Sequence, residues 1–120
     1  MAIRYLLDEH LNPAYRSQLV RREPELVVRM IGDLDAPPKG TLDPDILIWC
    51  ETNGFILVTN NRKSMPGHLA DHLASGHHVL GIFTINTDQS IGQSVEELIT
   101  IAGASEEDEY QDRIEYLPLT

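Results

Sequence analysis

The chain of 120 residues has little cysteine, few aromatic residues and no long apolar run. Its single cysteine, Cys50, excludes an internal disulfide bond and a zinc site built from several cysteines. Because Cys50 has apolar neighbours, we expect it to be a buried core residue. No apolar stretch approaches the ~18 residues that a membrane span requires, and the N-terminus does not have the pattern of a secretory signal peptide. The sequence therefore predicts a cytoplasmic protein with no membrane partner.

Basic residues are also scarce, and they are unevenly distributed. The net charge is −10, which disfavours nucleic acid as a partner because phosphate binding depends on Lys and Arg. However, residues 1–85 contain ten acidic and eight basic residues, whereas residues 86–120 contain nine acidic residues and one basic residue. The acidity thus belongs mostly to the C-terminal segment. Its densest part, residues 105–112, is predicted to begin a solvated helix with Ser105 as N-cap rather than to mimic nucleic acid.

Apolar runs typical of buried strands alternate with helical patterns along the chain. The predicted strands are 3–7, 25–31, 55–59, 77–86 and 113–118, and the predicted helices are 12–23, 43–54, 68–76 and 94–104. This alternation favours a three-layer α/β/α fold with a mainly parallel central sheet. A chain of this length and composition is most simply one domain, which we expect over residues 1–120.

The helix predicted at 43–54 has the clearest end signals. Asp43 is expected at the N-cap, Pro44 at the first helical position and Gly54 beyond the last turn. Capping alone would explain Asp43. A role of Asp43 in a functional site stays open beside it.

Polar residues follow several predicted strands at the point where each strand ends. In an open parallel sheet, ligands bind in the crevice beyond the carboxyl ends of the strands. Carboxylates that meet there repel one another, and a divalent cation with oxygen ligands is the usual compensation. We therefore expect a Mg²⁺ or Mn²⁺ site that acts on a phosphodiester. The residues expected at this crevice are Asp8, Glu9, Asp43, Asp45, Asn60, Asn61, Thr84, Asn86 and Asp88.

Three segments in order, "LLDEHL", "DPDIL" and "FILVTNNRK", resemble the PIN-like nuclease family, most closely a short prokaryotic branch related to the VapC toxins. The resemblance spans residues 3–86, and its specificity lies in the order and spacing of short motifs. It implies RNA cleavage that depends on Mg²⁺ or Mn²⁺, in a toxin whose partner is a small antitoxin protein. A homo-oligomer stays open as well. The resemblance implies Asp8, Asp43 and Asn61 as catalytic residues, Asp8, Asp43 and Asp45 as metal ligands, and Glu9, Thr59, Asn60, Arg62, Lys63 and Asp88 as supporting residues.

The third motif departs from the family pattern, because Asn61 and Lys63 stand where PIN-like proteins have acids. An amide oxygen can coordinate a hard cation but brings no charge, and Lys63 adds repulsion, so metal affinity should be weaker. Asp45 or Asp88 would have to serve in place of the missing acid. Two hypotheses stay open: an active ribonuclease, and a PIN-like module that has lost catalysis and binds RNA or a partner protein.

The segment "HLADH" places His68 and His72 four residues apart on one predicted helix, a spacing that can bind a transition metal. Because the sequence offers no evident third ligand, we interpret both histidines as solvated or hydrogen-bonded. His77 and His78 are interpreted as surface or strand-edge residues, and so is His10 unless it lines the crevice.

Two other classes of α/β protein have little support. A phosphoacceptor receiver domain would need an acceptor Asp near Asn61 and a Lys after its last strand, and the chain has neither. A dinucleotide-binding fold would need a Gly-rich turn after the first strand, which is also missing.

Overall fold

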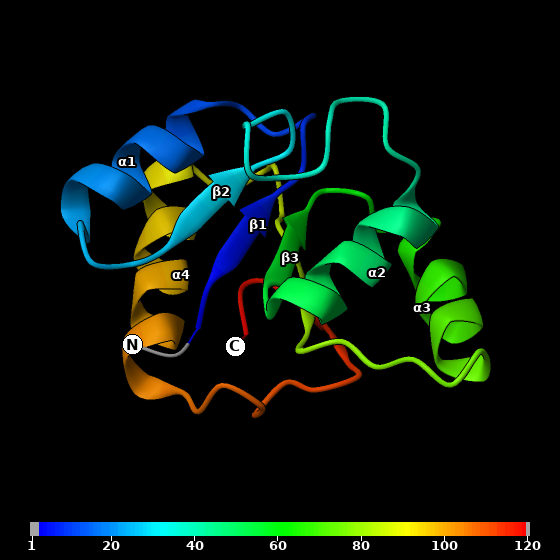
Figure 1. Cartoon of the computed structure of the whole chain (residues 1–120). Helices are drawn as coiled ribbons and strands as arrows, with labels where there is room; N and C mark the ends of the chain where they lie inside the picture. Colours follow the sequence, from blue (N-terminus) through cyan, green and yellow to red (C-terminus); the bar gives the residue numbers. More distant parts are fainter. Residues whose placement is uncertain (1–2, 120) are drawn as a thin grey trace.

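Within residues 3–119, five short strands form one sheet in the order β2-β1-β3-β4-β5, and every pair of neighbouring strands is parallel. The computed structural model describes residues 3–119. Figure 1 shows β1 and β3 in the middle of the fold, with helices on both sides. The strands are β1 (Tyr5–Leu7), β2 (Val28–Met30), β3 (Ile56–Thr59), β4 (Ile82–Thr84) and β5 (Ile114–Tyr116).

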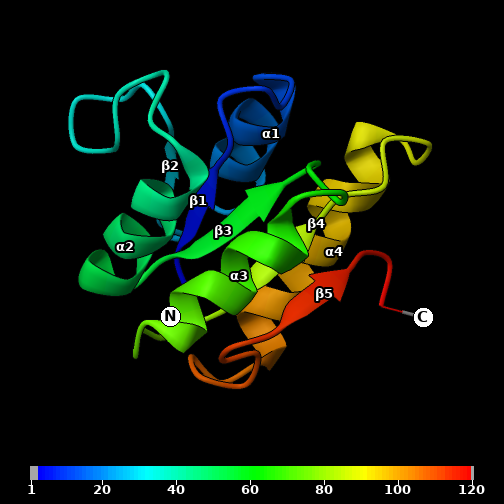
Figure 2. The same cartoon turned by 90° about the vertical axis from the view of Figure 1, so that its right-hand side faces the viewer.

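In the described part of the chain, four helices cover the two faces of this sheet, which confirms the predicted three-layer α/β/α arrangement. Helices α1 and α4 lie on one face, and α2 and α3 lie side by side on the other (Figures 1 and 2). The helices are α1 (Ala14–Arg22), α2 (Asp43–Asn53), α3 (Met65–Ala74) and α4 (Ile91–Ala104).

The central strands are apolar on both faces because helices cover both. In β1, Tyr5 and Leu7 pack into the core under α1 and α4, whereas Leu6 packs into the core under α2 and α3. All three residues are fully buried. Cys50 of α2 is buried in the second core, as predicted, and this burial raises the pKa of its thiol. The alternation of side chains along a strand explains why one strand supplies both cores.

The beginning of α2 differs from the prediction by one residue, and the difference matters for function. Leu42 is the N-cap, so Asp43 is the first helical residue and not the cap. The carboxylate of Asp43 therefore does not cap the helix. The predicted end is confirmed, since Gly54 adopts the left-handed conformation with φ of 75°.

The acidic segment 105–112 forms turns, so the predicted helix start is wrong. Ser105 is the C-cap of α4, and the amides of Glu109 and Gln111 bond to carbonyls three residues earlier. Four consecutive acidic residues repel one another in a helix, which favours the more open turns. Asp112 ends the segment with a φ of 59°, outside the helical region.

The predicted strand 77–86 is also shorter than expected, because only Ile82–Thr84 pairs in the sheet. The amide of His77 bonds to the His72 carbonyl, and the amide of Val79 bonds to the Asp112 carboxylate. These contacts use the backbone donors that a longer strand would need. Of the helices described in residues 3–119, none is both long and apolar enough to cross a membrane.

The strand order places a natural binding crevice between β1 and β3. From β1 the chain moves outward to β2, and it then returns to β3 on the opposite side of β1. Such a reversal separates the loops that leave the carboxyl ends of the two strands, and ligands bind in the opening. Asp8 follows β1, and Asn60 and Asn61 follow β3.

Candidate functional site

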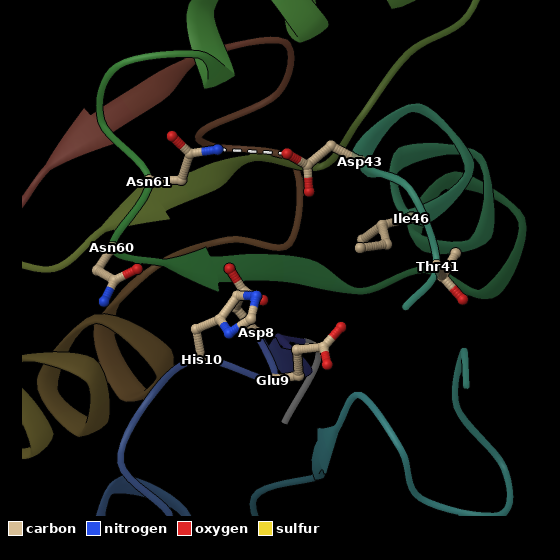
Figure 3. Close-up of a pocket in the computed structure, with 8 residues that line it drawn as sticks. All are labelled: Asp8, Glu9, His10, Thr41, Asp43, Ile46, Asn60 and Asn61. Carbon is tan, nitrogen blue, oxygen red and sulfur yellow. Dashed lines mark hydrogen bonds between the residues drawn. The ribbon is translucent and has the colours of Figure 1, made fainter. Parts of the chain in front are cut away.

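A cavity of about 220 Å³ lies beyond the carboxyl ends of β1 and β3. Residues from both strand ends, from the loop before α2 and from α2 itself line it. Figure 3 shows the carboxylates of Asp8 and Asp43 pointing into the same space from opposite sides. The lining residues are Asp8, Glu9, His10, Thr41, Asp43, Ile46, Asn60 and Asn61.

Asp8 is the deepest acid of this cavity and is only 8% exposed. Its Oδ2 accepts a hydrogen bond of 2.8 Å from the hydroxyl of Thr59, at the end of β3. Within residues 3–119, Asp8 is the one buried acidic residue, and it forms no salt bridge. A buried carboxylate without a cationic partner is costly. The site therefore has negative charge that a bound cation would neutralise.

Asp43 brings a second carboxylate to the cavity from the first turn of α2. Asn61 Nδ2 donates to Asp43 Oδ2 at 3.2 Å, and His68 Nε2 lies 3.4 Å from the same oxygen. The carboxylate is about a quarter exposed. Because Leu42 takes the N-cap position, the Asp43 side chain is available for these contacts across the cavity.

Asn61 is held in one orientation by its neighbour Ser64. The Ser64 amide donates to Asn61 Oδ1 at 3.2 Å, and Asn61 Nδ2 donates to the Ser64 hydroxyl oxygen at 2.7 Å, so the Asn61 NH₂ group lies on the side of Asp43. In this orientation Asn61 presents a donor, and not an oxygen ligand, to the acidic cavity. A cation that used Asn61 as a ligand would require the amide to rotate.

Glu9 connects the cavity to the loop before α2. Its Oε1 accepts a hydrogen bond of 2.9 Å from the amide of Gly40. This contact holds the long loop against the end of β1, where Thr41 joins the lining. The sequence does not predict Thr41 or Ile46 at the cavity, because the position of a long loop and the rotation of a helix depend on packing. His10 lines the cavity, so it belongs to the candidate site and is not merely a surface residue.

Several predicted site residues lie outside the cavity. Asp45 is exposed two residues after Asp43, about 200° round the helix axis, so it faces away from Asp43. Asp88 is exposed in the turn after β4, where its amide bonds to Asn86 Oδ1 at 2.9 Å. Neither acid lines the cavity, so neither takes the place of the acid missing at Asn61.

The two basic residues after Asn61 are both exposed. The Arg62 guanidinium lies 5.0 Å from the ring centre of Tyr116, which is itself 43% exposed. Lys63 follows at the surface beside the turn that leads into α3. Thr84, predicted at the crevice, is fully buried at the end of β4 and lies outside the cavity lining.

The two histidines of "HLADH" have different partners. His68 faces Asp43 at the edge of the cavity. His72 is buried, with a side chain only 4% exposed, and contacts Glu51 of α2. Of the two predicted states, solvated or hydrogen-bonded, His72 has the second. Both histidines line the groove between α2 and α3, but they contact different acids.

Comparison of the chain with protein-family models, with curated proteins and with solved structures gives no match.

Proposed function

We propose that the cavity binds Mg²⁺ or Mn²⁺ through Asp8 and Asp43, and that the protein is a metal-dependent ribonuclease of the PIN-like type. The main support is the buried carboxylate of Asp8, which has a hydroxyl partner but no cationic one. A second carboxylate points into the same cavity. Carboxylate oxygens are the ligands that these hard cations prefer.

The remaining polar groups suit the same chemistry. When bound, the cation would lower the pKa of a coordinated water and stabilise charge on a phosphate. Thr59 orients the Asp8 carboxylate, and Glu9 fixes the loop that closes one side of the cavity. His10 lines the cavity and is exposed there, so its imidazole can reach a bound phosphate or water.

Single-stranded RNA is the substrate that the surface favours. Arg62 directly follows Asn61 of the cavity and stacks on the exposed ring of Tyr116. Exposed aromatic and guanidinium planes are surfaces on which unpaired bases stack. Lys63 adds a second positive charge for the phosphate backbone.

A second function, a module that binds RNA or a small antitoxin-like protein without catalysis, is favoured by two observations. The Asn61 amide already donates to Asp43, so one carboxylate oxygen has a hydrogen-bond partner without any cation. Lys63 also stands where the resemblance predicts an acid.

Incubation with single-stranded RNA and Mn²⁺ distinguishes the two functions. The wild type should cleave RNA, Asp8→Asn should lose nearly all cleavage, and Asp88→Asn should cleave like the wild type because Asp88 lies outside the cavity. Calorimetry with Mn²⁺ on the same three proteins gives the second readout. Mn²⁺ binding that depends on Asp8 but brings no cleavage would favour the binding module. A wild type that neither binds Mn²⁺ nor cleaves RNA would refute the nuclease proposal.

A further inference from the structure

A second group of metal-ligating side chains lies at the far end of α2. It consists of Glu51, His72 and His77, whose ligand atoms all lie within 4.8 Å of one another. Glu51 is eight residues after Asp43, which places it about 12 Å further along the helix axis. The group is therefore distinct from the acidic cavity.

The end of α3 brings the two histidines together. Gly76 has a φ of 85° and directly follows the C-cap Ser75. The His77 amide bonds to the His72 carbonyl at 3.1 Å, and the Gly76 amide bonds to the Leu73 carbonyl at 3.0 Å. These two bonds define a Schellman motif, which folds the chain back over the last turn. As a result the two imidazole rings stack, with centres 4.8 Å apart and planes 22° apart.

Helix packing supplies the third side chain. Because α2 lies beside α3, Glu51 reaches both rings. Its Oε1 lies 3.1 Å from His72 Nε2 and 3.0 Å from His77 Nδ1. Neighbouring ligands around a tetrahedral zinc ion, with bonds of about 2.0–2.1 Å, lie about 3.3 Å apart. The two Glu51 contacts thus already have nearly the separation that a shared ion needs, and the two histidine nitrogens lie within 4.8 Å of each other.

We propose that Glu51, His72 and His77 bind a Zn²⁺ ion. Two imidazoles and one carboxylate form a recognised zinc ligand set that leaves one position for water. This set is softer than the acids of the cavity, so it selects zinc over Mg²⁺ and Mn²⁺. The proposal does not depend on nuclease activity.

The burial and access of the ligands suit such an ion. His72 is held rigidly, with 4% of its side chain exposed, whereas the His77 and Glu51 side chains are 42% and 32% exposed. An ion can therefore enter from the surface and meet a fixed ligand. A groove of about 160 Å³, which both histidines line, runs between α2 and α3.

Zinc would replace the contacts that His72 and His77 now make with acceptor oxygens. His72 Nε2 lies 3.1 Å from the His78 carbonyl as well as from Glu51. Coordination uses the lone pairs of His72 Nε2 and His77 Nδ1, so any proton on these atoms is released to solvent and the contact with His78 is lost.

Zinc titration of the tag-free full chain tests the proposal, in buffer with excess Mg²⁺ to occupy hard-cation sites. The wild type should bind one Zn²⁺ per chain, and Zn²⁺ should raise its thermal midpoint. Loss of an outer-shell partner typically weakens metal binding about 10–100-fold, so Glu51→Gln and His77→Ala, which remove ligands, should weaken it at least about 100-fold. Both positions are partly exposed, so these variants should fold.

His78→Ala is the matched control, because His78 is the adjacent histidine but pairs with Asp112 outside the group. It should bind zinc like the wild type. Co²⁺ as a probe should give the visible spectrum of a four-coordinate ion in the wild type and in this control. A wild type that binds no Zn²⁺ would overturn the proposal. Equal affinity in the wild type, Glu51→Gln and His77→Ala would overturn it as well.

Discussion

The two ends of α2 carry polar groups that were assembled in different ways. At its beginning, Asp43 meets Asp8 and Asn61, which stand at the carboxyl ends of parallel strands. Near its end, Glu51 meets His72 and His77, which a helix-ending turn of α3 brings together. The first group offers hard oxygen ligands and unbalanced negative charge. The second offers imidazole nitrogens that already contact a carboxylate.

One helix can therefore hold two chemically different groups. The strand ends place side chains at the edge of the sheet, where ligands of an α/β fold collect. The packing of α2 on α3 places side chains at a helix interface, where no rule of topology predicts a site. The two groups depend on the same helix, but they have different ligands and different routes of assembly.

The largest expected effect comes from loosening α2 itself. Leu47 is fully buried between the two groups. Leu47→Ala should lower the free energy of unfolding by about 2–5 kcal/mol, because it removes buried contacts and leaves a cavity. Urea denaturation measures this, and both metal affinities should fall together.

Ile48→Ala is the control: Ile48 is 44% exposed, so its change should stay within about 0.5 kcal/mol. Loss of only one affinity in Leu47→Ala would show that α2 does not couple the sites.

A change at Gly76 should affect the histidine group and leave the acidic cavity unchanged. A side chain at φ of 85° is strained, so Gly76→Ala should cost about 1–2 kcal/mol of stability. It should also weaken Zn²⁺ binding by displacing His77, while Mn²⁺ binding stays unchanged. Gly67→Ala is the matched control, because Gly67 lies in α3 without a positive φ. Neither added methyl would meet an atom within 4 Å. Gly67→Ala should be neutral or stabilising, by up to about 1 kcal/mol.

An acid introduced at position 61 should strengthen Mn²⁺ binding at the acidic cavity and leave the histidine group unchanged. Asn61→Asp places a third carboxylate beside Asp43 and Asp8, so Mn²⁺ affinity should rise about tenfold. Without metal the variant should be less stable, because like charges would replace a hydrogen bond. Calorimetry and thermal unfolding, each with and without Mn²⁺, measure both effects. Unchanged Mn²⁺ affinity would place the ion elsewhere.

The smallest effect concerns His78, which lies beside the histidine group but outside it. A hydrogen bond to Asp112 and the charge of that carboxylate raise the pKa of His78 above its usual 6.5. The folded state therefore binds this proton more tightly than the unfolded state. The stabilisation is fully present below about pH 6.5 and is lost as the pH rises through the raised pKa. His78→Gln should lower the thermal midpoint slightly at about pH 5 and leave it unchanged at about pH 9. An equal effect at both pH values would contradict the assignment.

Some features of both groups can be predicted from the sequence because they depend on local rules. Asp8 and Asn61 follow strands that parallel pairing aligns, so their shared edge follows from the order of elements. The end of α3 at Gly76 also follows from the sequence, but the pattern after it predicts His77 in a strand, so the approach of His77 to His72 is not predicted. The spacing of His68 and His72 in "HLADH" does not indicate the contact between His72 and His77, because both residues of the motif lie within one helix.

Other features depend on tertiary packing. The sequence predicts Asp43 at the cap of α2, but the helix begins one residue earlier and the carboxylate faces Asn61. Asp45 and Asp88 have the right residue type near the right strands, but both are exposed outside the cavity. Glu51 has no neighbour in the chain that suggests a site.

The sequence by itself determined the alternation of strands and helices, the parallel sheet and the edge at which Asp8 and Asn61 lie. These follow from apolar periodicity and backbone hydrogen bonding, which act over a few residues. Only the tertiary structure decided that Asp43 turns into the cavity and that Glu51 meets two histidines. Such contacts depend on how helices rotate and slide as their side chains pack, and that outcome is set by the whole core.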